Sequence, residues 1–260
     1  MNVENTDEIL TAHRELWEKK PVLREIYTEY YKLIHRSCIA GNILEIGGGS
    51  GNFKGFLSES ISVDIVSLPW LDAIADAHTL PFKDHCFSNI VMVDVLHHIE
   101  HPVRFLLEAD RVLLPGGRLI CIEPAITPVS WIFLHFFHPE PIDMEQNPFI
   151  ESLPDQTRRP FDANQAIPTL LFNRYRVPFA EQFPDLKIII FKYLDLFAYP
   201  LSGGFRHWCL IPGPLTHHIL KIEQFLMPVL GPLMAFRFYC IVEKNREDSR
   251  IETNIITSKN

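Results

Sequence analysis

The chain has 260 residues, of which 47% are hydrophobic and 22% charged; this composition is ordinary for a packed globular protein and excludes wholesale disorder. Lys and Arg number 24 and Asp and Glu number 32, and the resulting net charge of −8 argues against nucleic acid as a partner. The five cysteines are scattered without a CxxC pair, which excludes a zinc ribbon and is typical of a reducing compartment. Because the polar N-terminus shows no secretory signal, we expect a cytoplasmic protein.

Residues 1–40 predict an N-terminal helical flap. Apolar side chains recur every three or four positions between Trp17 and Ile34, which gives a helix one apolar face. Pro21 is expected to open the second of two helical pieces, because proline fits the first turn of a helix.

Residues 41–124 predict an α/β core. Short apolar runs indicate strands over residues 42–46, 61–65, 73–76, 89–94 and 118–123. Helical spacing begins at Asn52 and again over residues 102–114, where the segment Pro115-Gly116-Gly117 ends it. Strands that alternate with helices are typical of a parallel sheet covered on both faces.

Proline and aromatic residues become frequent after Glu123. Residues 125–185 are expected to form a cap insertion. Residues 186–243 hold the remaining core strands, over 186–193 and 234–243, with a second insertion at about 196–233 between them. Loops of this length inside a compact domain are usually functional. Residues 244–260 form a polar tail.

The insertions also contain apolar segments whose environment the sequence leaves open. The segment 219–242 is interrupted by charges and prolines, so we expect soluble core rather than a membrane-spanning helix. Core packing is also the first expectation for the aromatic side chains of the insertions. The alternatives are that they enclose an apolar acceptor, or that residues 131–137 or 219–236 make a weak contact with a membrane surface. These aromatic residues are Trp131, Phe133, Phe136, Phe137, Tyr199, Phe205 and Trp208.

A glycine cluster follows the first strand of the core. Gly47, Gly48, Gly49 and Gly51 let the backbone turn tightly and expose bare peptide at the start of a helix. Asp64 ends the next strand, where a carboxylate in a doubly wound sheet accepts hydrogen bonds from a ribose diol. Together these features predict an adenosine-containing cofactor.

Further motifs follow in a fixed order. They are the segment Asp76-Ala77-His78-Thr79-Leu80-Pro81-Phe82, the segment Asp94-Val95-Leu96-His97-His98, and the turn Arg111-Val112-Leu113-Leu114-Pro115-Gly116-Gly117. With the glycine loop, residues 42–124 resemble the class I S-adenosylmethionine-dependent methyltransferases, in particular the small-molecule, type 11-like branch. The resemblance implies a Rossmann-like α/β fold with a seven-strand sheet, mostly parallel with an antiparallel last strand, plus N-terminal helices and an inserted cap.

The resemblance also implies which residues hold S-adenosylmethionine. The glycines and Glu45 would surround its methionine end, and a flap tyrosine, Tyr31, would close over that end unless it packs in the core. The ribose would lie at the end of the second strand, the adenine after the third, and the inner side of the cofactor after the fourth. The residues at these places are Asp64, Ile65, Asp76, Ala77, Asp94 and Val95.

Catalysis needs little beyond alignment of the acceptor, because the methyl donor is strongly activated. Where the acceptor must lose a proton, His97 and His98 after the fourth strand and Glu123 at the end of the fifth are the candidate bases. His135, His138 and Glu140 resemble a metal-ligand cluster, but Pro139 breaks any helix there, so we expect no metal.

The expected function is methyl transfer to a small, partly apolar acceptor, with oxygen as the first choice of nucleophile atom, then carbon, then nitrogen. Two alternatives stay open: a catalytically silent partner subunit that binds S-adenosylmethionine, and an NAD(P)-dependent oxidoreductase. The sequence does not reveal the oligomeric state.

Overall fold

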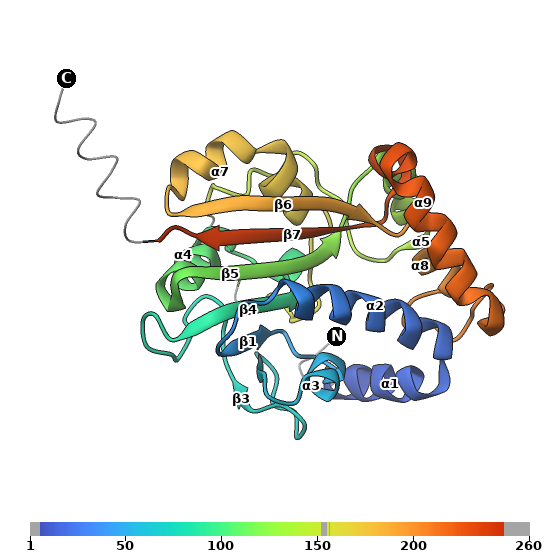
Figure 1. Ribbon diagram of the computed structural model, residues 1–260, viewed down its shortest axis with the longest axis horizontal. Helices are drawn as coiled ribbons and strands as arrows, with labels where there is room; N and C mark the ends of the chain where they lie inside the picture. The colour runs from blue at the N-terminus through green and yellow to red at the C-terminus, as the bar shows by residue number, and fades with distance from the viewer. Residues whose placement is uncertain (1–5, 152–154, 156, 247–260) are drawn as a thin grey trace.

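The computed structural model describes residues 6–151, 155 and 157–246, and most of the predicted polar tail lies outside this part. Seven strands form one sheet in the order β3-β2-β1-β4-β5-β7-β6 (Figure 1). The pairings of β7 with β5 and β6 are antiparallel and the other pairings among the described strands are parallel, which confirms the predicted fold class. The strands are β1 Ile43–Ile46, β2 Ile61–Asp64, β3 Ala73–Ile74, β4 Phe87–Val93, β5 Leu113–Pro124, β6 Leu186–Leu194 and β7 Arg237–Lys244.

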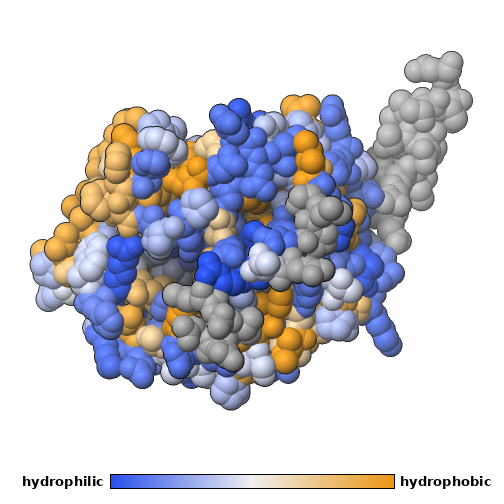
Figure 2. All heavy atoms as spheres, turned by 180° about the vertical axis from the view of Figure 1, so that it is seen from behind, coloured by the Kyte–Doolittle hydropathy of each residue, from blue (hydrophilic) through white to orange (hydrophobic). Residues whose placement is uncertain are grey.

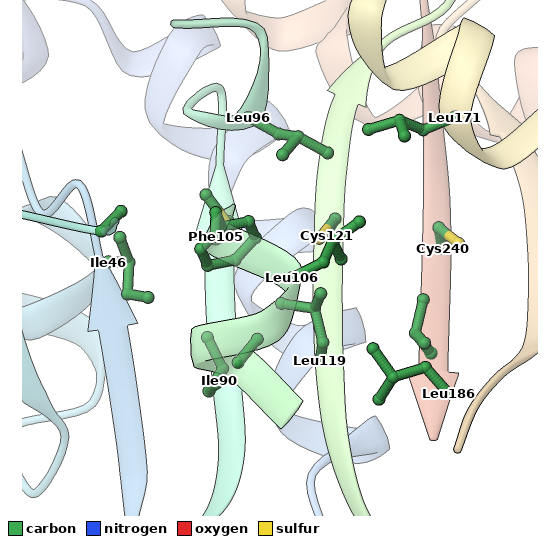
Figure 3. Packing of buried hydrophobic residues seen from close by; sticks show 14 of the residues in the cluster. Ile46, Ile90, Leu96, Phe105, Leu106, Leu119, Cys121, Leu171, Leu186 and Cys240 are labelled. Carbon is green, nitrogen blue, oxygen red and sulfur yellow. The ribbon is translucent and has the colours of Figure 1, made fainter. Parts of the chain in front are cut away.

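Helices cover both faces of this sheet, because the buried strands alternate their side chains between the two faces. Ile90 of β4 and Cys121 of β5 face α4, whose Phe105 and Leu106 pack on them (Figure 3). Val91, the next residue of β4, faces α2 on the opposite side of the sheet. The α-helices are α1 Thr6–Lys19, α2 Pro21–Ser37, α3 Asn52–Phe56, α4 Pro102–Val112, α5 Pro128–Phe137, α6 Ile167–Thr169, α7 Arg176–Gln182, α8 Ala198–Ser202 and α9 Thr216–Met234.

The break between α1 and α2 falls at Lys20, and Pro21 opens α2 as predicted. The buried Lys20 ammonium donates to the carbonyl oxygens of Gly204, Arg206 and Trp208, at 2.7, 2.8 and 2.9 Å. These bonds satisfy the ammonium inside the protein. They also fasten the second insertion to the N-terminal helices.

The apolar segment 219–242 divides between two environments. Its last part is β7, which is buried in the sheet as expected. The core prediction is wrong for α9, because only Thr216, Glu223 and Gly231 of this helix are buried. It is also wrong for four aromatic residues of the insertions, whose side chains are exposed: Trp131, Phe136, Phe137 and Trp208.

None of the helices described here has both the length and the apolar character that a bilayer crossing requires.

Candidate active site

The carboxyl ends of β1, β2, β4 and β5 meet at one edge of the sheet, where ligands of open α/β sheets bind. The glycine loop after β1 lies against the loop after β4. Gly47 has φ +71, and a Cβ at this position would lie 2.4 Å from Cγ2 of Val95. Only glycine permits this approach and this backbone conformation.

Asp64 at the end of β2 supports the same loop. Its carboxylate accepts the N–H of Gly49 at 2.9 Å and the N–H of Val66 at 3.1 Å. Burial raises the pKa of Asp64, although these backbone hydrogen bonds oppose the shift. The adjacent Ile65 is exposed.

Trp70 and Arg14 lie over the outer side of the glycine loop. The Trp70 indole donates to the carbonyl oxygen of Gly49 at 2.8 Å, and Arg14 donates to the carbonyl oxygen of Ser50 at 3.1 Å. The Arg14 guanidinium stacks over the indole at 4.9 Å. Arg14 could not be predicted as a neighbour of this loop, because nothing in the sequence pattern of α1 indicates the contact.

Glu45 of β1 is buried beneath the loop, where the Ser62 hydroxyl donates to its carboxylate. Burial raises the pKa of Glu45 to about 8. Tyr31 of α2 is also buried, packed against Phe53 and Phe56. The predicted flap tyrosine is therefore part of the packed core. Burial raises the pKa of Tyr31, and the nearby Glu45 raises it further.

These groups fit the chemistry of S-adenosylmethionine. A Cβ at Gly49 would meet nothing closer than the Leu10 side chain at 3.5 Å, so the Cα side of this residue is open. The Asp64 carboxylate suits a ribose diol, the buried Glu45 acid can donate or accept a hydrogen bond, and glycine peptide suits close approach of a ligand. The glycine loop, Asp64 and Glu45 are thus the groups that would hold the cofactor.

The predicted adenine-side residues lie further along the edge. Asp76 is exposed, and its Oδ1 is 2.7 Å from Nδ1 of His78. Ala77 is buried in the core of the sheet. Their role toward the adenine stays a prediction.

Asp94 joins a buried polar network that the sequence analysis missed. Its carboxylate accepts from the Tyr27 hydroxyl at 2.7 Å and from the Arg237 guanidinium. The guanidinium stacks 3.9 Å from the ring centroid of Tyr199 and lies 3.8 Å from the Asp195 carboxylate. The strand order could have indicated this network. Asp195 follows the end of β6 and Arg237 begins the antiparallel β7, so both lie at the same edge of the sheet as Asp94.

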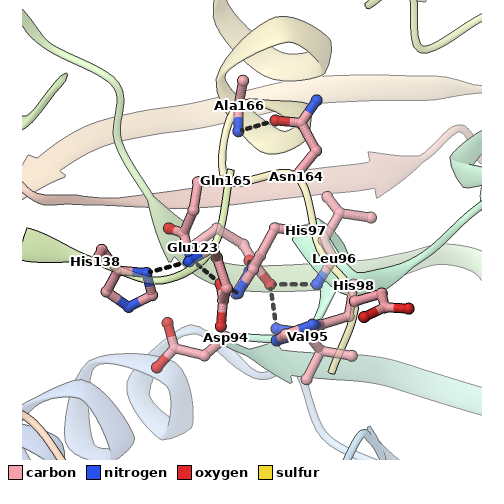
Figure 4. Close-up of polar contacts among 12 residues, drawn as sticks. Asp94, Val95, Leu96, His97, His98, Glu123, His138, Asn164, Gln165 and Ala166 are labelled. Carbon is pink, nitrogen blue, oxygen red and sulfur yellow. Dashed lines mark hydrogen bonds and ion pairs between the residues drawn. The ribbon is translucent and has the colours of Figure 1, made fainter. Parts of the chain in front are cut away.

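His97 and Glu123 form a buried pair beside this network (Figure 4). Nδ1 of His97 is 2.8 Å from Oε2 of Glu123, whose Oε1 accepts the N–H groups of Val95 and Leu96 at 2.9 and 2.7 Å. Burial lowers the pKa of His97, but the hydrogen bond and charge of Glu123 and the charge of Glu140 outweigh it. The pKa therefore lies above its usual value.

A cavity of about 440 Å³ opens beside His97. Most of its lining is polar: His97, Ile99, Glu100, Pro141, Asp143, Gln146, Asp155, Arg158, Ala163, Asn164 and Ile167. Nε2 of His97 lies 3.6 Å from Oε2 of Glu140, a residue of the first insertion. The insertion thus supplies much of the wall of this cavity. Of its residues, Glu140 was noted in the sequence only as part of the possible metal-ligand cluster, with no link to His97.

His98 differs from its neighbour. Its Nδ1 is buried without a hydrogen-bond partner in the described part of the chain, and burial followed by the charge of His97 holds its pKa well below the usual value. Ligand-type atoms of His97, His98 and Glu140 lie within 4.8 Å of one another, so the absence of a metal stays a prediction. His135, a member of the possible metal-ligand cluster noted in the sequence, stacks on Trp131.

Comparison with known proteins agrees with this geometry. Residues 44–121 match the methyltransferase domain family. An uncharacterized protein of Methanocaldococcus jannaschii is 35% identical over 103 residues, which are 36% of this chain and 50% of that protein. The ubiquinone/menaquinone biosynthesis C-methyltransferase UbiE of Acidiphilium cryptum is 43% identical over 51 residues, 20% of each chain. The chain thus spans half or less of these curated relatives.

The whole fold also has counterparts among solved structures. An S-adenosylmethionine-dependent methyltransferase from Thermotoga maritima superimposes with a TM-score of 0.53 at 18% identity, over 93% of this chain and 99% of that one. Residues 44–121 therefore match a methyltransferase domain, and the chain has the fold of this solved methyltransferase. S-adenosylmethionine is the cofactor that such a domain implies.

Proposed function

We propose that the chain is an enzyme that methylates a small acceptor whose polar, hydroxyl-bearing part enters the cavity beside His97. The observation that carries this proposal is the cavity of about 440 Å³ that has His97 in its wall. His97 also connects through Glu123 to the amides of Val95 and Leu96, in the loop that packs on the glycine loop. The acceptor and cofactor regions therefore share one loop.

Cofactor binding is assigned to the groups after β1 and β2. The backbone of the glycine loop faces the ligand, Asp64 accepts hydrogen bonds from the ribose, and Glu45 lies beneath as a buried acid. When bound, S-adenosylmethionine supplies a methyl group activated by a sulfonium.

The proposed catalytic base is His97. Glu123 accepts the Nδ1 proton, which fixes the tautomer in which Nε2 is free to take a proton from the acceptor. Glu140 faces the same nitrogen and stabilises the imidazolium that forms. His98 has a strongly lowered pKa and is a weaker base, so it is placed in the wall rather than in the proton transfer.

Deprotonation of a hydroxyl creates a nucleophile at oxygen and, in a phenol or an enol, also at the conjugated carbon one bond beyond the carbon that bears the oxygen. Methylation at that carbon is completed when the carbon loses its proton. The sequence analysis placed oxygen first, whereas one relative is named as a C-methyltransferase. Methylation at oxygen and methylation at carbon would use the same base. We therefore propose only that the acceptor bears a hydroxyl group. Mapping the labelled carbon in the product by NMR identifies the atom.

The test is incubation with methyl-labelled donor and fractionated extract, using the wild type, His97→Gln and the surface variant His35→Gln as a matched control. We expect one fraction to gain label with the wild type and the control, and a rate lower by about 10²–10⁴-fold with His97→Gln. Binding of the donor without transfer in any fraction would support the silent-subunit alternative. Saturable binding of NAD(P) instead of the donor would support the oxidoreductase.

A further inference from the structure

Exposed hydrophobic side chains gather at one end of the molecule. Figure 2 shows them as an orange area at the end that holds α5 and α9 in Figure 1, two helices in direct contact. On α9, Phe225 and Val229 are 83% and 79% exposed. We call this surface the α5–α9 patch; its members are Trp131, Ile132, Phe136, Phe137, Leu201, Trp208, Leu210, Leu215, Ile222, Phe225, Val229 and Leu233.

The pattern of α9 shows that this exposure follows from the sequence. Thr216, Glu223 and Gly231 lie on the buried side of the helix. Ile222, Phe225, Val229 and Leu233 recur at spacings of three and four, so they form a second apolar stripe that faces solvent. A continuous apolar surface of this kind marks an interaction site rather than ordinary exposure.

The charges around the patch differ from those of the whole chain. The net charge is −8, yet residues 124–138 and 196–236 contain a single acidic residue, Glu223. Glu223 is buried and accepts the N–H groups of Leu196 and Ala198 at the start of α8, so it adds no negative charge to the surface. The same segments contain Arg206, Lys221 and several histidines.

The patch also adjoins the proposed active site. Helix α5 begins shortly after β5, which ends beside Glu123, and α8 supplies Tyr199, which stacks on Arg237. In Figure 1, α5, α8 and α9 lie at the end of the sheet toward which β5 points. The carboxyl edge and the patch therefore belong to the same end of the molecule.

We propose that the α5–α9 patch docks on the surface of an anionic lipid bilayer. Phe225, Val229 and their neighbours would enter the boundary between headgroups and acyl chains, with α9 in the plane of the membrane. Trp131 and Trp208 suit that boundary, because tryptophan favours membrane interfaces. Charge favours a membrane over a second copy of the chain, because Arg206 and Lys221 complement lipid phosphates, whereas an identical surface would present the same cations. The half-exposed Glu25 of α2 lies 3.9 Å from His217 of α9.

One consequence of docking rests on the proposed function. A membrane-held acceptor with a polar head would present that head to the cavity beside His97 while its apolar part stays in the bilayer. The docking itself is tested by binding alone, so its failure is distinguishable from failure of the proposed methyl transfer.

The test is flotation of the full chain with vesicles of phosphatidylcholine, with or without phosphatidylglycerol. We expect flotation with the anionic vesicles, and a floated fraction reduced about tenfold by the double variant Phe225→Glu/Val229→Glu. Val177→Glu is the matched control, because Val177 is 68% exposed on α7, outside the patch. This variant should float like the wild type. Circular dichroism verifies that each variant is folded.

Three outcomes would overturn the proposal. The wild type could stay wholly unbound with both vesicle types, or the Val177 control could lose binding as much as the double variant. The third outcome concerns size-exclusion chromatography with light scattering. A wild type that is a dimer and a double variant that is a monomer would assign the patch to a second copy of the chain.

Discussion

Nδ1 of His97 lies 2.8 Å from Oε2 of Glu123, so a buried carboxylate at the end of β5 orients the imidazole in the loop after β4. Burial alone would lower the pKa of His97, but Glu123 and Glu140 raise it above the usual value. A base must be neutral to accept a proton. We therefore expect kcat to fall as the pH drops through a pKa above about 6.5.

The Glu123→Gln variant separates this account from a purely structural role. Loss of the carboxylate charge lowers the pKa of His97, so the acidic limb of the kcat profile should move to lower pH while kcat falls. If the acidic limb of the kcat profile stays at the same pH in Glu123→Gln, or in His97→Gln, another group sets the pH dependence.

Gly47 has φ +71, and a Cβ there would lie 2.4 Å from the Val95 side chain. We expect Gly47→Ala to lower the free energy of unfolding by about 1–3 kcal/mol and to weaken cofactor binding. The matched control is Gly55→Ala in α3, where a Cβ would meet no atom within 4 Å. That variant should be neutral or more stable by roughly 0.5–1 kcal/mol, because alanine favours a helix. Urea unfolding measures both.

Glu45 should make the protein less stable at high pH. Burial raises its pKa to about 8, so between about pH 4.5 and 8 the folded protein keeps a proton that the unfolded chain has lost. Raising the pH through this window therefore lowers the free energy of unfolding, by up to about 5 kcal/mol. Glu45→Gln should flatten the slope but not abolish it, since burial also raises the pKa of Asp195 to about 8. A slope identical to that of the wild type would contradict this assignment.

Arg237 is the buried cation between the half-buried carboxylate of Asp94 and the buried carboxylate of Asp195. Arg237→Met leaves these acids without their partner, so we expect a loss of about 3–5 kcal/mol in the free energy of unfolding. Arg104→Met is the control, because its pair with Glu151 lies at the surface and should leave Tm unchanged. Equal effects of the two substitutions on Tm would show that the network around Arg237 contributes little.

The α/β core could be read from the sequence because its local signals agree with one another. Short apolar runs, glycines after the first strand and Pro21 at a helix start each specify local structure. Glu45, Asp64 and Asp94 were predicted at strand ends, and parallel strands bring such ends to one edge. The predicted cofactor residues follow from these local rules.

The insertions could not be read in the same way. Glu140 reaches His97, and Arg237 reaches Asp94, only through tertiary packing of segments far apart in the sequence. The apolar character of α9 indicated burial, but its buried side is narrow and carries the charged Glu223. Composition gives the apolar content of a segment, whereas the face that it turns to the protein depends on its neighbours.

Binding of S-adenosylhomocysteine, measured by isothermal calorimetry, tests the central claim most directly. The claim is that the glycine loop and Asp64 form the cofactor site. We predict one saturable site in the wild type and in Gly55→Ala. In Asp64→Ala we predict an affinity lower by about 10–100-fold, because the ribose hydroxyls lose a charged acceptor. The absence of saturable binding in the wild type, or an unchanged affinity in Asp64→Ala, would contradict the account.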